Sequence, residues 1–366
     1  MTALQEKKMK TKLELLLHGM CLSEFSYNVF QKDGTFFPEV IRSGASFGLE
    51  CIVDDDIYVN VPIRNASKNR IADDCSQLIM SSGEELKLET IKDPFSYTLS
   101  IEDNKQIKRV AKTCYDRLDI TLVTGCHYKH IGIGCEFCGI EKSIHYGNYV
   151  LSNDQVLRIM ELAQKEKGKR IKHVLLSGGS MISEDMGIHL FTERADRIKE
   201  HYPTLSIYVM LPPPTNLSVL QRLLDSGIDE VAMNMELLSD EALGLIPAKK
   251  LIGKERYLKS LEFLASRMPQ YSVRSILMVG LEDDKYTLEG VTDLSKRGVM
   301  PILSLYRAIN NHKLKLLDSV SVDSLFELWM NAMEICTRNG TLLGPLCIPC
   351  QNNTISFPTN SQYRFY

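Results

Sequence analysis

The sequence of 366 residues lacks the features that mark membrane proteins and nucleic-acid-binding proteins. It has no run of 18 or more apolar residues, so we expect no transmembrane helix. Its formal net charge of −3 gives no general attraction to nucleic acid or to an anionic membrane. It also has no internal repeat and no low-complexity tract. We therefore expect a cytoplasmic globular protein with neither a nucleic acid nor a membrane as its partner.

The N-terminus has the charge order of a signal peptide without its composition. Four lysines between positions 7 and 12 precede an apolar stretch over 13–22. Glu14 and His18 interrupt that stretch, and no small-residue cleavage site follows. We interpret this segment as a short amphipathic helix.

Cysteines are numerous and clustered. Three of the ten lie between positions 126 and 138, and two more are Cys347 and Cys350. A disulfide framework is typical of small secreted domains, whereas clustered cysteines in a long intracellular chain indicate a metal site. Four others are interpreted as buried small apolar residues: Cys21, Cys51, Cys75 and Cys114.

Three segments are predicted along the chain. Residues 1–115 form a small N-terminal α/β domain, whose clearest element is a hairpin from Ser46 to Val61 that turns at 54–56. Residues 116–310 alternate strands with helices. Residues 311–366 contain a helix over 322–338 and an irregular tail with cysteines, which we expect to cover the mouth of the barrel described next.

The alternation gives six β/α units with short apolar strands. Such strands indicate a parallel sheet covered by helices. Six units are too few for a closed eight-fold barrel, so we predict a partial (β/α)6 barrel of the TIM type; an open doubly wound sheet is the competing architecture. The six strands are expected over 118–124, 173–176, 206–211, 230–233, 272–279 and 302–305.

A loop with three cysteines follows the first of these strands. Cys126 is separated by eight residues from Cys135, and Glu136 and Phe137 separate that residue from Cys138. In parallel β/α folds, the loops after the strand ends carry the functional site. Thiolates bind iron–sulfur clusters and zinc. Three thiolates on a four-iron cube leave one iron open to a small molecule.

Zinc is the alternative ligand for this loop. His127 and His130 would complete a tetrahedral set with the cysteines, and the chain would then be a zinc-stabilised binding protein without radical chemistry. Such a loop requires neither a Gly-Gly pair at the next strand end nor a barrel after it.

A strand, a cysteine loop ending in C-x2-C with an aromatic residue inside it, and a β/α barrel together resemble the radical S-adenosylmethionine (SAM) superfamily. The C-x8-C-x2-C spacing differs from the commonest pattern, in which three residues separate the first two cysteines. Three further motifs follow in the family's order over residues 115–310, and one of the three, the Asn-x-Glu motif, is similar to lipoyl and biotin synthases. They are Ser177-Gly178-Gly179-Ser180, Asn234-Met235-Glu236 and the segment 276–282, which contains Met278.

This resemblance implies a role for each motif. The segment 177–180 resembles a GGE-type motif whose carbonyls receive the SAM amino group, with Ser180 in the usual acidic position. Glu236 is expected to reach the ribose or methionine part of SAM, and Arg274 its carboxylate. The segment 276–282 and Phe137 are expected beside adenine.

The implied activity is radical chemistry. Cys126, Cys135 and Cys138 would hold a [4Fe–4S] cluster, and one electron would cleave SAM to a 5′-deoxyadenosyl radical that takes hydrogen from a substrate. The expected partners are a small-molecule or peptide substrate and an electron donor such as flavodoxin or ferredoxin. Sulfur insertion, rearrangement, methylation and peptide modification all remain open as the biosynthetic step.

Cys347 and Cys350 form a second candidate metal site. They would ligate an auxiliary iron–sulfur cluster, with Cys336 as a candidate third ligand. The alternatives are a substrate-pocket role, a structural role and a thioredoxin-like pair, although no strand–helix context supports the last.

Overall fold

The fold is described from a computed structural model. It covers residues 1–32, 48–92, 100–102, 105–107, 110–140, 150–165, 171–307 and 314–366. Ser46 and Phe47 of the expected hairpin lie outside these ranges. Among the described helices, none is both long and apolar enough to cross a membrane.

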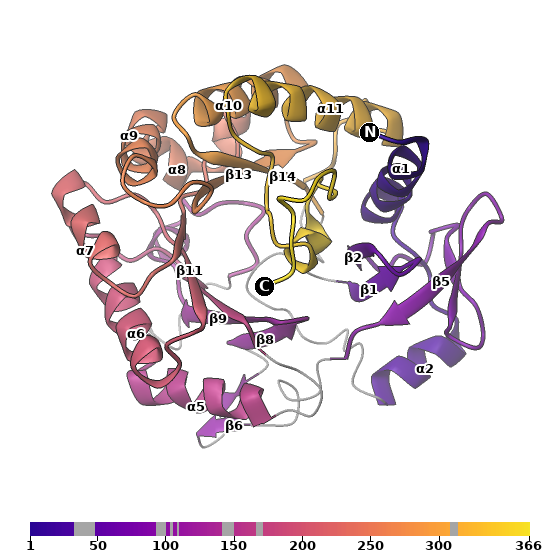
Figure 1. The fold of residues 1–366 in the computed structure, drawn as a ribbon, viewed down its shortest axis with the longest axis horizontal. Helices are drawn as coiled ribbons and strands as arrows, with labels where there is room; N and C mark the ends of the chain where they lie inside the picture. The colour runs from indigo at the N-terminus through magenta and orange to yellow at the C-terminus, as the bar shows by residue number, and fades with distance from the viewer. Residues whose placement is uncertain are drawn as a thin grey trace.

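The central element is a curled sheet of seven strands that forms a partial barrel (Figure 1). Six neighbouring strands are parallel in chain order, as predicted, and β8 pairs antiparallel with β9 at one edge. The competing doubly wound order is absent from the described strands. The strands are β8 (Ala111–Cys114), β9 (Arg117–Val123), β10 (His173–Gly178), β11 (Ser206–Met210), β12 (Glu230–Ala232), β13 (Val273–Val279) and β14 (Met300–Leu305).

Helices cover the outer face of this sheet (Figure 1). The predicted helix over 322–338 is present with those bounds, and Ser321 caps its start through the backbone N–H of Ser324. The described helices after β9 are α4 (His127–His130), α5 (Asn153–Lys165), α6 (Ile188–His201), η2 (Leu217–Leu220), α7 (Gln221–Leu224), η3 (Ala242–Leu245), α8 (Pro247–Ile252), α9 (Lys254–Ala265), α10 (Asp284–Ser295), α11 (Val322–Arg338) and η4 (Pro349–Asn353).

Alternation along the strands separates the helix-covered face from the interior of the barrel. In β9, Leu118 and Ile120 are fully buried in the core, whereas Arg117, Asp119 and Thr121 line a central cavity. This two-residue period follows from the pleat of a strand. Polar side chains of the sheet therefore point to one shared space.

The N-terminal region fills the gap between the two edges of the curled sheet (Figure 1). Its hairpin of β1 and β2 is present as predicted, with the turn at 54–56. Arg307, after β14, donates to the backbone and side-chain oxygens of Asn60 at 2.9 and 2.8 Å. Near the other edge, Lys112 of β8 pairs with Glu50 of β1 at 3.8 Å. The hairpin thus spans from the last barrel strand to the first.

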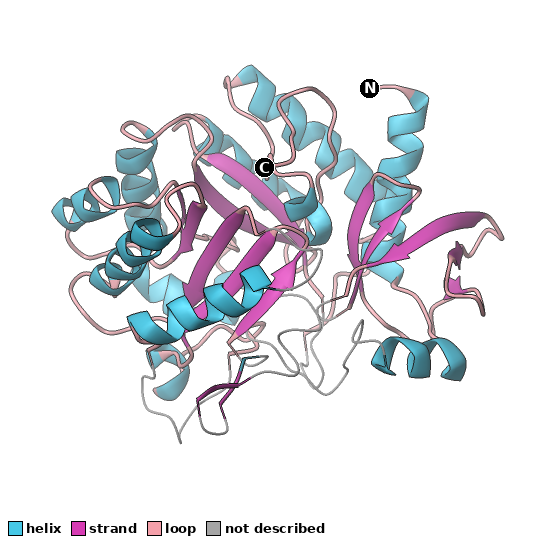
Figure 2. Ribbon diagram, turned by 60° about the horizontal axis from the view of Figure 1, so that its bottom comes forward, coloured by secondary structure: helices cyan, strands magenta, loops and turns pink. Residues whose placement is uncertain are grey.

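The remaining N-terminal elements flank this hairpin (Figure 2). Two helices precede it, and further short strands follow it in an antiparallel sheet of order β2-β1-β5-β4-β3 and a separate pair. These elements are α1 (Ala3–His18), α2 (Glu24–Lys32), β1 (Leu49–Val53), β2 (Ile57–Val61), β3 (Arg70–Ile71), β4 (Gln77–Ile79), β5 (Glu85–Thr90), β6 (Ser100–Glu102) and β7 (Lys105–Gln106).

The C-terminal tail lies at the start of the barrel strands. Cys350 contacts His173, the first residue of β10, and the Tyr366 hydroxyl donates to Glu230, the first residue of β12, at 2.5 Å. The cysteine loop follows the opposite ends of the strands. The expectation that the tail covers that mouth is therefore wrong, because irregular, proline-containing sequence does not reveal which end it approaches.

Candidate functional site

The cysteine loop is built around one helical turn. Cys126 directly precedes α4, and the Ile133 N–H closes the turn by donating to the Tyr128 carbonyl at 2.9 Å. The Cys138 N–H then donates to the Cys135 carbonyl at 3.2 Å. Compared with the commonest three-residue spacing, the eight residues between Cys126 and Cys135 therefore accommodate one helical turn, α4.

Two glycines allow this loop to lie against the end of β10. A Cβ on Gly179 would lie 1.9 Å from the Gly125 carbonyl oxygen, and one on Gly178 would lie 2.6 Å from the Val123 oxygen. Neither contact is sterically allowed, so both positions require glycine. The His127 N–H also donates to the Ser180 carbonyl at 2.9 Å. The SGGS segment thus fixes the start of the cysteine loop.

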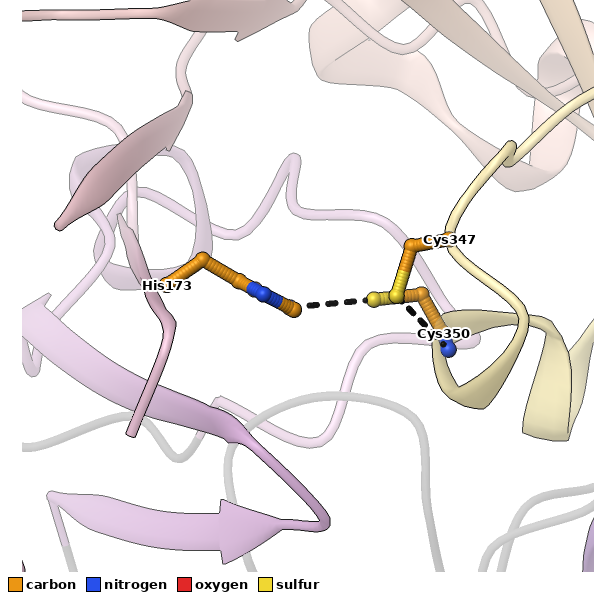
Figure 3. Close-up of side chains that lie close together, drawn as sticks. All are labelled: His173, Cys347 and Cys350. Carbon is orange, nitrogen blue, oxygen red and sulfur yellow. Dashed lines mark hydrogen bonds between the residues drawn. The ribbon is translucent and has the colours of Figure 1, made fainter. Parts of the chain in front are cut away.

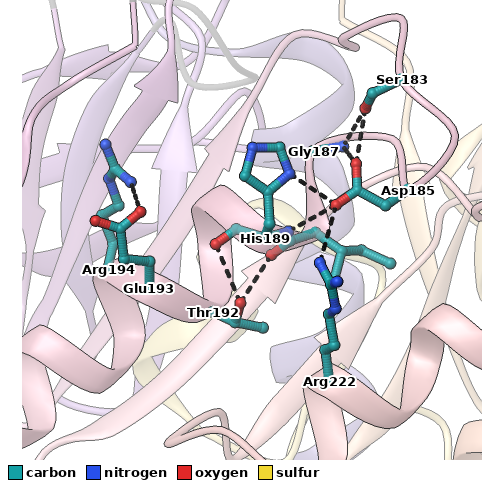
Figure 4. Close-up of polar contacts among 9 residues, drawn as sticks. Ser183, Asp185, Gly187, His189, Thr192, Glu193, Arg194 and Arg222 are labelled. Atoms are coloured by element: carbon teal, nitrogen blue, oxygen red, sulfur yellow. Dashed lines mark hydrogen bonds and ion pairs between the residues drawn. The ribbon is translucent and has the colours of Figure 1, made fainter.

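The loop after β10 is itself anchored by a half-buried carboxylate (Figure 4). Asp185 accepts from the His189 ring at 2.7 Å, from the Ser183 hydroxyl at 2.8 Å and from the Gly187 N–H at 3.1 Å. Although burial raises the pKa of Asp185, hydrogen bonds from the His189 backbone and ring, with those of Ser183 and Gly187, lower it to about 2. This carboxylate connects the SGGS segment to α6.

Asn234 and Glu236 lie where β12 meets β13. The Asn234 side-chain oxygen accepts from the Ile276 N–H at 3.1 Å, and the Glu236 carbonyl accepts from the Met278 N–H at 2.7 Å. Glu236 has a φ of 70°, a region costly for a residue with a side chain. Backbone conformations of this kind persist where surrounding contacts hold the residue in place, as the contacts with β13 hold Glu236.

The last residue of the segment 276–282 has a structural partner. Both carboxylate oxygens of Glu282 accept from the Leu238 N–H, at 3.0 and 3.1 Å, and one also accepts from the Ser239 N–H at 2.7 Å. Glu282 therefore holds the loop that follows Glu236 and does not line the cavity.

Most of the predicted site residues line one central cavity of about 970 Å³. The cavity also contacts residues of the N-terminal hairpin and of the tail, including Cys350 but not Cys347. The predicted residues on its wall are Cys126, Cys135, Phe137, Cys138, Ser177, Gly178, Gly179, Ser180, Asn234, Glu236, Arg274 and Met278.

The three thiols of the loop are electrostatically linked. Burial, with Cys138, Glu236 and Cys126, raises the pKa of Cys135 to about 12 against the lowering effect of Lys249. Burial also raises the pKa of Cys138. The three sulfurs do not form a group within 4.8 Å of one another among the described residues.

Lys249 of α8 is a candidate site residue that the sequence motifs do not reveal. Its ammonium group donates to the Asn234 carbonyl and lies 3.4 Å from the Glu236 carboxylate. Burial raises the pKa of Glu236, and Lys249 opposes that rise. Burial lowers the pKa of Lys249, but Tyr257, Glu236 and Cys135 together raise it, so the group stays charged. It is a half-buried cation beside the cysteine loop.

Arg274 lies toward the other end of the barrel. It forms an ion pair with Glu230, and its guanidinium lies 4.8 Å from the centre of the Tyr208 ring. Met278, near the cysteine loop, is four residues farther along β13, which is about 13 Å of strand. Arg274 therefore has the Glu230 carboxylate as its partner in the structure, whereas the sequence analysis expected it to bind the SAM carboxylate.

Cys347 and Cys350 come together with His173, and Cys336 does not join them (Figure 3). His173 was not predicted, because a lone histidine at the start of an apolar strand carries no motif.

Comparison with known proteins assigns the barrel to a family. Residues 120–291 match the model of the Radical SAM superfamily. The chain therefore contains a radical SAM domain over these residues. Members of this superfamily use a [4Fe–4S] cluster and SAM. The enzyme class and both cofactors predicted from the motifs are confirmed, which sets aside the zinc-stabilised binding protein.

Solved structures resemble the chain at low sequence identity. SuiB of Streptococcus suis, bound to S-adenosylmethionine, is 12% identical, with a TM-score of 0.46 over 64% of this chain and 50% of SuiB. HydG of Carboxydothermus hydrogenoformans, a maturase of the FeFe-hydrogenase, is 16% identical, with a TM-score of 0.43 over 68% of this chain and 60% of HydG. The matched region thus spans half the length of SuiB. None of the curated proteins matches the sequence.

Proposed function

We propose that Cys126, Cys135 and Cys138 hold the cluster and that the cavity beside them binds SAM together with a substrate. The observation that carries this proposal is the shared cavity wall formed by the three thiols, the Gly178–Gly179 pair and Glu236. When bound, the cluster and SAM supply a 5′-deoxyadenosyl radical that abstracts hydrogen from the substrate.

Two groups of residues are suited to the two ends of SAM. The backbone of 177–180 lies on the cavity wall, where its carbonyls suit the amino group. Phe137 and Met278 belong to one apolar cluster with Leu237 and suit the adenine ring. Glu236 is placed for the ribose hydroxyls, which prefer a carboxylate acceptor.

We assign the SAM carboxylate to Lys249 and not to Arg274. Lys249 is a half-buried cation close to Glu236 and Cys135, whereas Arg274 is already paired with Glu230. Lys249 would neutralise the carboxylate, and its charge lowers the pKa of the Cys135 and Cys138 thiols against the effect of burial.

The deeper part of the cavity is a candidate substrate chamber. Its wall includes the charged side chains of Arg117, Asp119 and Lys112, which are shielded from solvent. Buried charges of both signs favour a polar small molecule over an apolar one. Sulfur insertion, rearrangement, methylation and peptide modification remain the candidate reactions.

The reaction needs an electron from a donor such as flavodoxin or ferredoxin. A reducing compartment such as the cytoplasm suits this requirement. All ten cysteines are free thiols, which agrees with such a setting.

A cluster-ligand variant tests the proposal. Cys138→Ala removes one of three thiolates, so we expect iron to fall from about four per chain to nearly none and 5′-deoxyadenosine formation to stop. The measurement is iron and sulfide content of anaerobically purified protein, electron paramagnetic resonance with and without SAM, and product analysis under dithionite.

Cys336→Ala is the matched control, because this buried cysteine lies on α11 and does not line the cavity. It should retain iron and SAM cleavage. If the Cys138 variant still cleaves SAM, the assignment of the cluster to this loop is wrong.

A further inference from the structure

A second group of metal-binding side chains lies at the end of the barrel where the strands begin (Figure 3). His173 Nε2 and Cys350 Sγ are 3.1 Å apart, and the Cys350 backbone N–H donates to Cys347 Sγ at 3.2 Å. The ligand atoms of the three residues all lie within 4.8 Å of one another, and all three residues are buried.

Two buried polar atoms near this group have no hydrogen-bond partner. They are His173 Nδ1 and Asp116 Oδ1. An unpaired buried donor or acceptor costs about 1–3 kcal/mol, so each such atom in a folded protein calls for a ligand or a water. Asp116 is close enough that burial, His173 and Cys350 all act on the pKa of its carboxyl.

The compactness of the group distinguishes between metal types. In a tetrahedral site with metal–sulfur bonds of about 2.3 Å, two sulfurs lie about 3.8 Å apart. The ligand atoms of the group all lie within 4.8 Å of one another, so little movement would bring them to that spacing. Cysteines on different irons of a cubane lie farther apart, and only two cysteines are present here.

We propose that His173, Cys347 and Cys350 bind one thiophilic divalent metal ion of the zinc class, with a fourth coordination position left for a further ligand. The donor set of two sulfurs and one imidazole matches the preferences of such an ion. The site is separate from the cluster loop, because β10 carries His173 at its first residue and Gly178 at its last, about 16 Å away along the strand.

The role of the ion is to fasten the tail across the barrel. Cys347 and Cys350 flank the start of η4 in the tail, whereas His173 belongs to the barrel. The Tyr366 ring packs 4.5 Å from the His173 ring. A metal bond between tail and barrel closes the end of the cavity remote from the cluster and excludes water there.

The test measures metals in the full-length protein purified without air and without chelator. We expect about one zinc per chain in addition to about four irons. Cys350→Ser should lose the zinc and keep the iron, whereas Cys336→Ser should keep both. In protein exchanged with cobalt, a thiolate-to-cobalt charge-transfer band should form and be absent in Cys350→Ser.

Three outcomes would overturn the proposal. The wild-type protein could hold iron alone at about four per chain, or carry a Cys347–Cys350 disulfide by mass analysis. It could also hold about eight irons that fall to four in Cys350→Ser, which would make the pair ligands of an auxiliary cluster. Because Cys138→Ala removes iron and Cys350→Ser removes zinc, failure of one assignment is distinguishable from failure of the other.

Discussion

Gly179 is the residue on which the position of the cysteine loop depends most directly. Its missing side chain lets the Gly125 carbonyl approach to a distance that a Cβ would reduce to 1.9 Å. In Gly179→Ala the strand end and the loop must separate, so we expect iron content to fall at least several-fold. The measurement is iron per chain after anaerobic reconstitution, with circular dichroism to verify folding.

Gly244→Ala is the control for this variant. Its Cβ would meet no atom within 4 Å, and its backbone is not in a left-handed conformation. It should bind iron as the wild type does and be equally or slightly more stable, because alanine restricts the unfolded chain. Full iron in Gly179→Ala would mean that the loop does not need this close approach.

At the scale of elements, helix α1 is connected to the tail by a buried lysine. Lys12 is 1% exposed, and its ammonium group donates to the Gln351 and Ser356 carbonyls, both at 2.7 Å. No carboxylate acts on its pKa, and burial lowers that pKa to about 7. The contact is therefore sensitive to pH.

This pKa predicts how stability changes with pH. Between pH 7 and about 10.5 the unfolded chain keeps a proton on Lys12 that the folded chain releases, so the free energy of unfolding rises with pH. Relative to Lys12→Met, which has no such proton, the wild type should gain at most about 3 kcal/mol between pH 7 and 9.5. Urea unfolding at both pH values measures the difference.

Lys7→Met on the same helix is the matched control. Lys7 is exposed, and its hydrogen bond and ion pair with Glu84 raise its pKa. The difference in the free energy of unfolding between Lys7→Met and the wild type should stay nearly constant up to pH 9.5. A constant difference for Lys12→Met as well would show that Lys12 is charged in the folded protein.

The sequence predicts elements well where one signal dominates. The six parallel strands follow from apolar runs, and α11 follows from its capping serine and its apolar periodicity. The edge strand β8 is not predicted, because it is only four residues long and contains Lys112, whose partner Glu50 is distant in sequence. Short edge strands depend on tertiary contacts that local patterns do not contain.

The site shows the same contrast between residues that local patterns predict and residues that depend on tertiary contacts. Cys126, Cys135 and Cys138 carry a spacing that can be read locally, and the family match agrees with it. Lys249 and His173 lie outside any motif, and only the closing of the barrel brings them to the site residues. Their roles depend on burial and on partners far along the chain, which single-residue patterns do not report.

At the scale of the molecule, the division at 115 and 310 remains a prediction, and the packing suggests how it can be tested. One hydrophobic core contains members of all three segments, among them Leu13 of α1, Leu118 of β9 and Trp329 of α11. Arg307 and Lys12 add polar contacts across the same boundaries. A core shared in this way favours cooperative unfolding of the segments together.

We therefore expect a single unfolding transition. Trp329 is the only tryptophan and lies in the shared core, so its fluorescence should change at the same urea concentration as the far-ultraviolet circular dichroism. Native-state hydrogen exchange should give the protected amides of β1 and β2 the same opening free energy as those of β9 and β10. If β1 and β2 exchange at lower urea than the barrel, residues 1–115 unfold independently. The hairpin would then be a removable cover of the cavity, and residues 116–310 would stay folded without it.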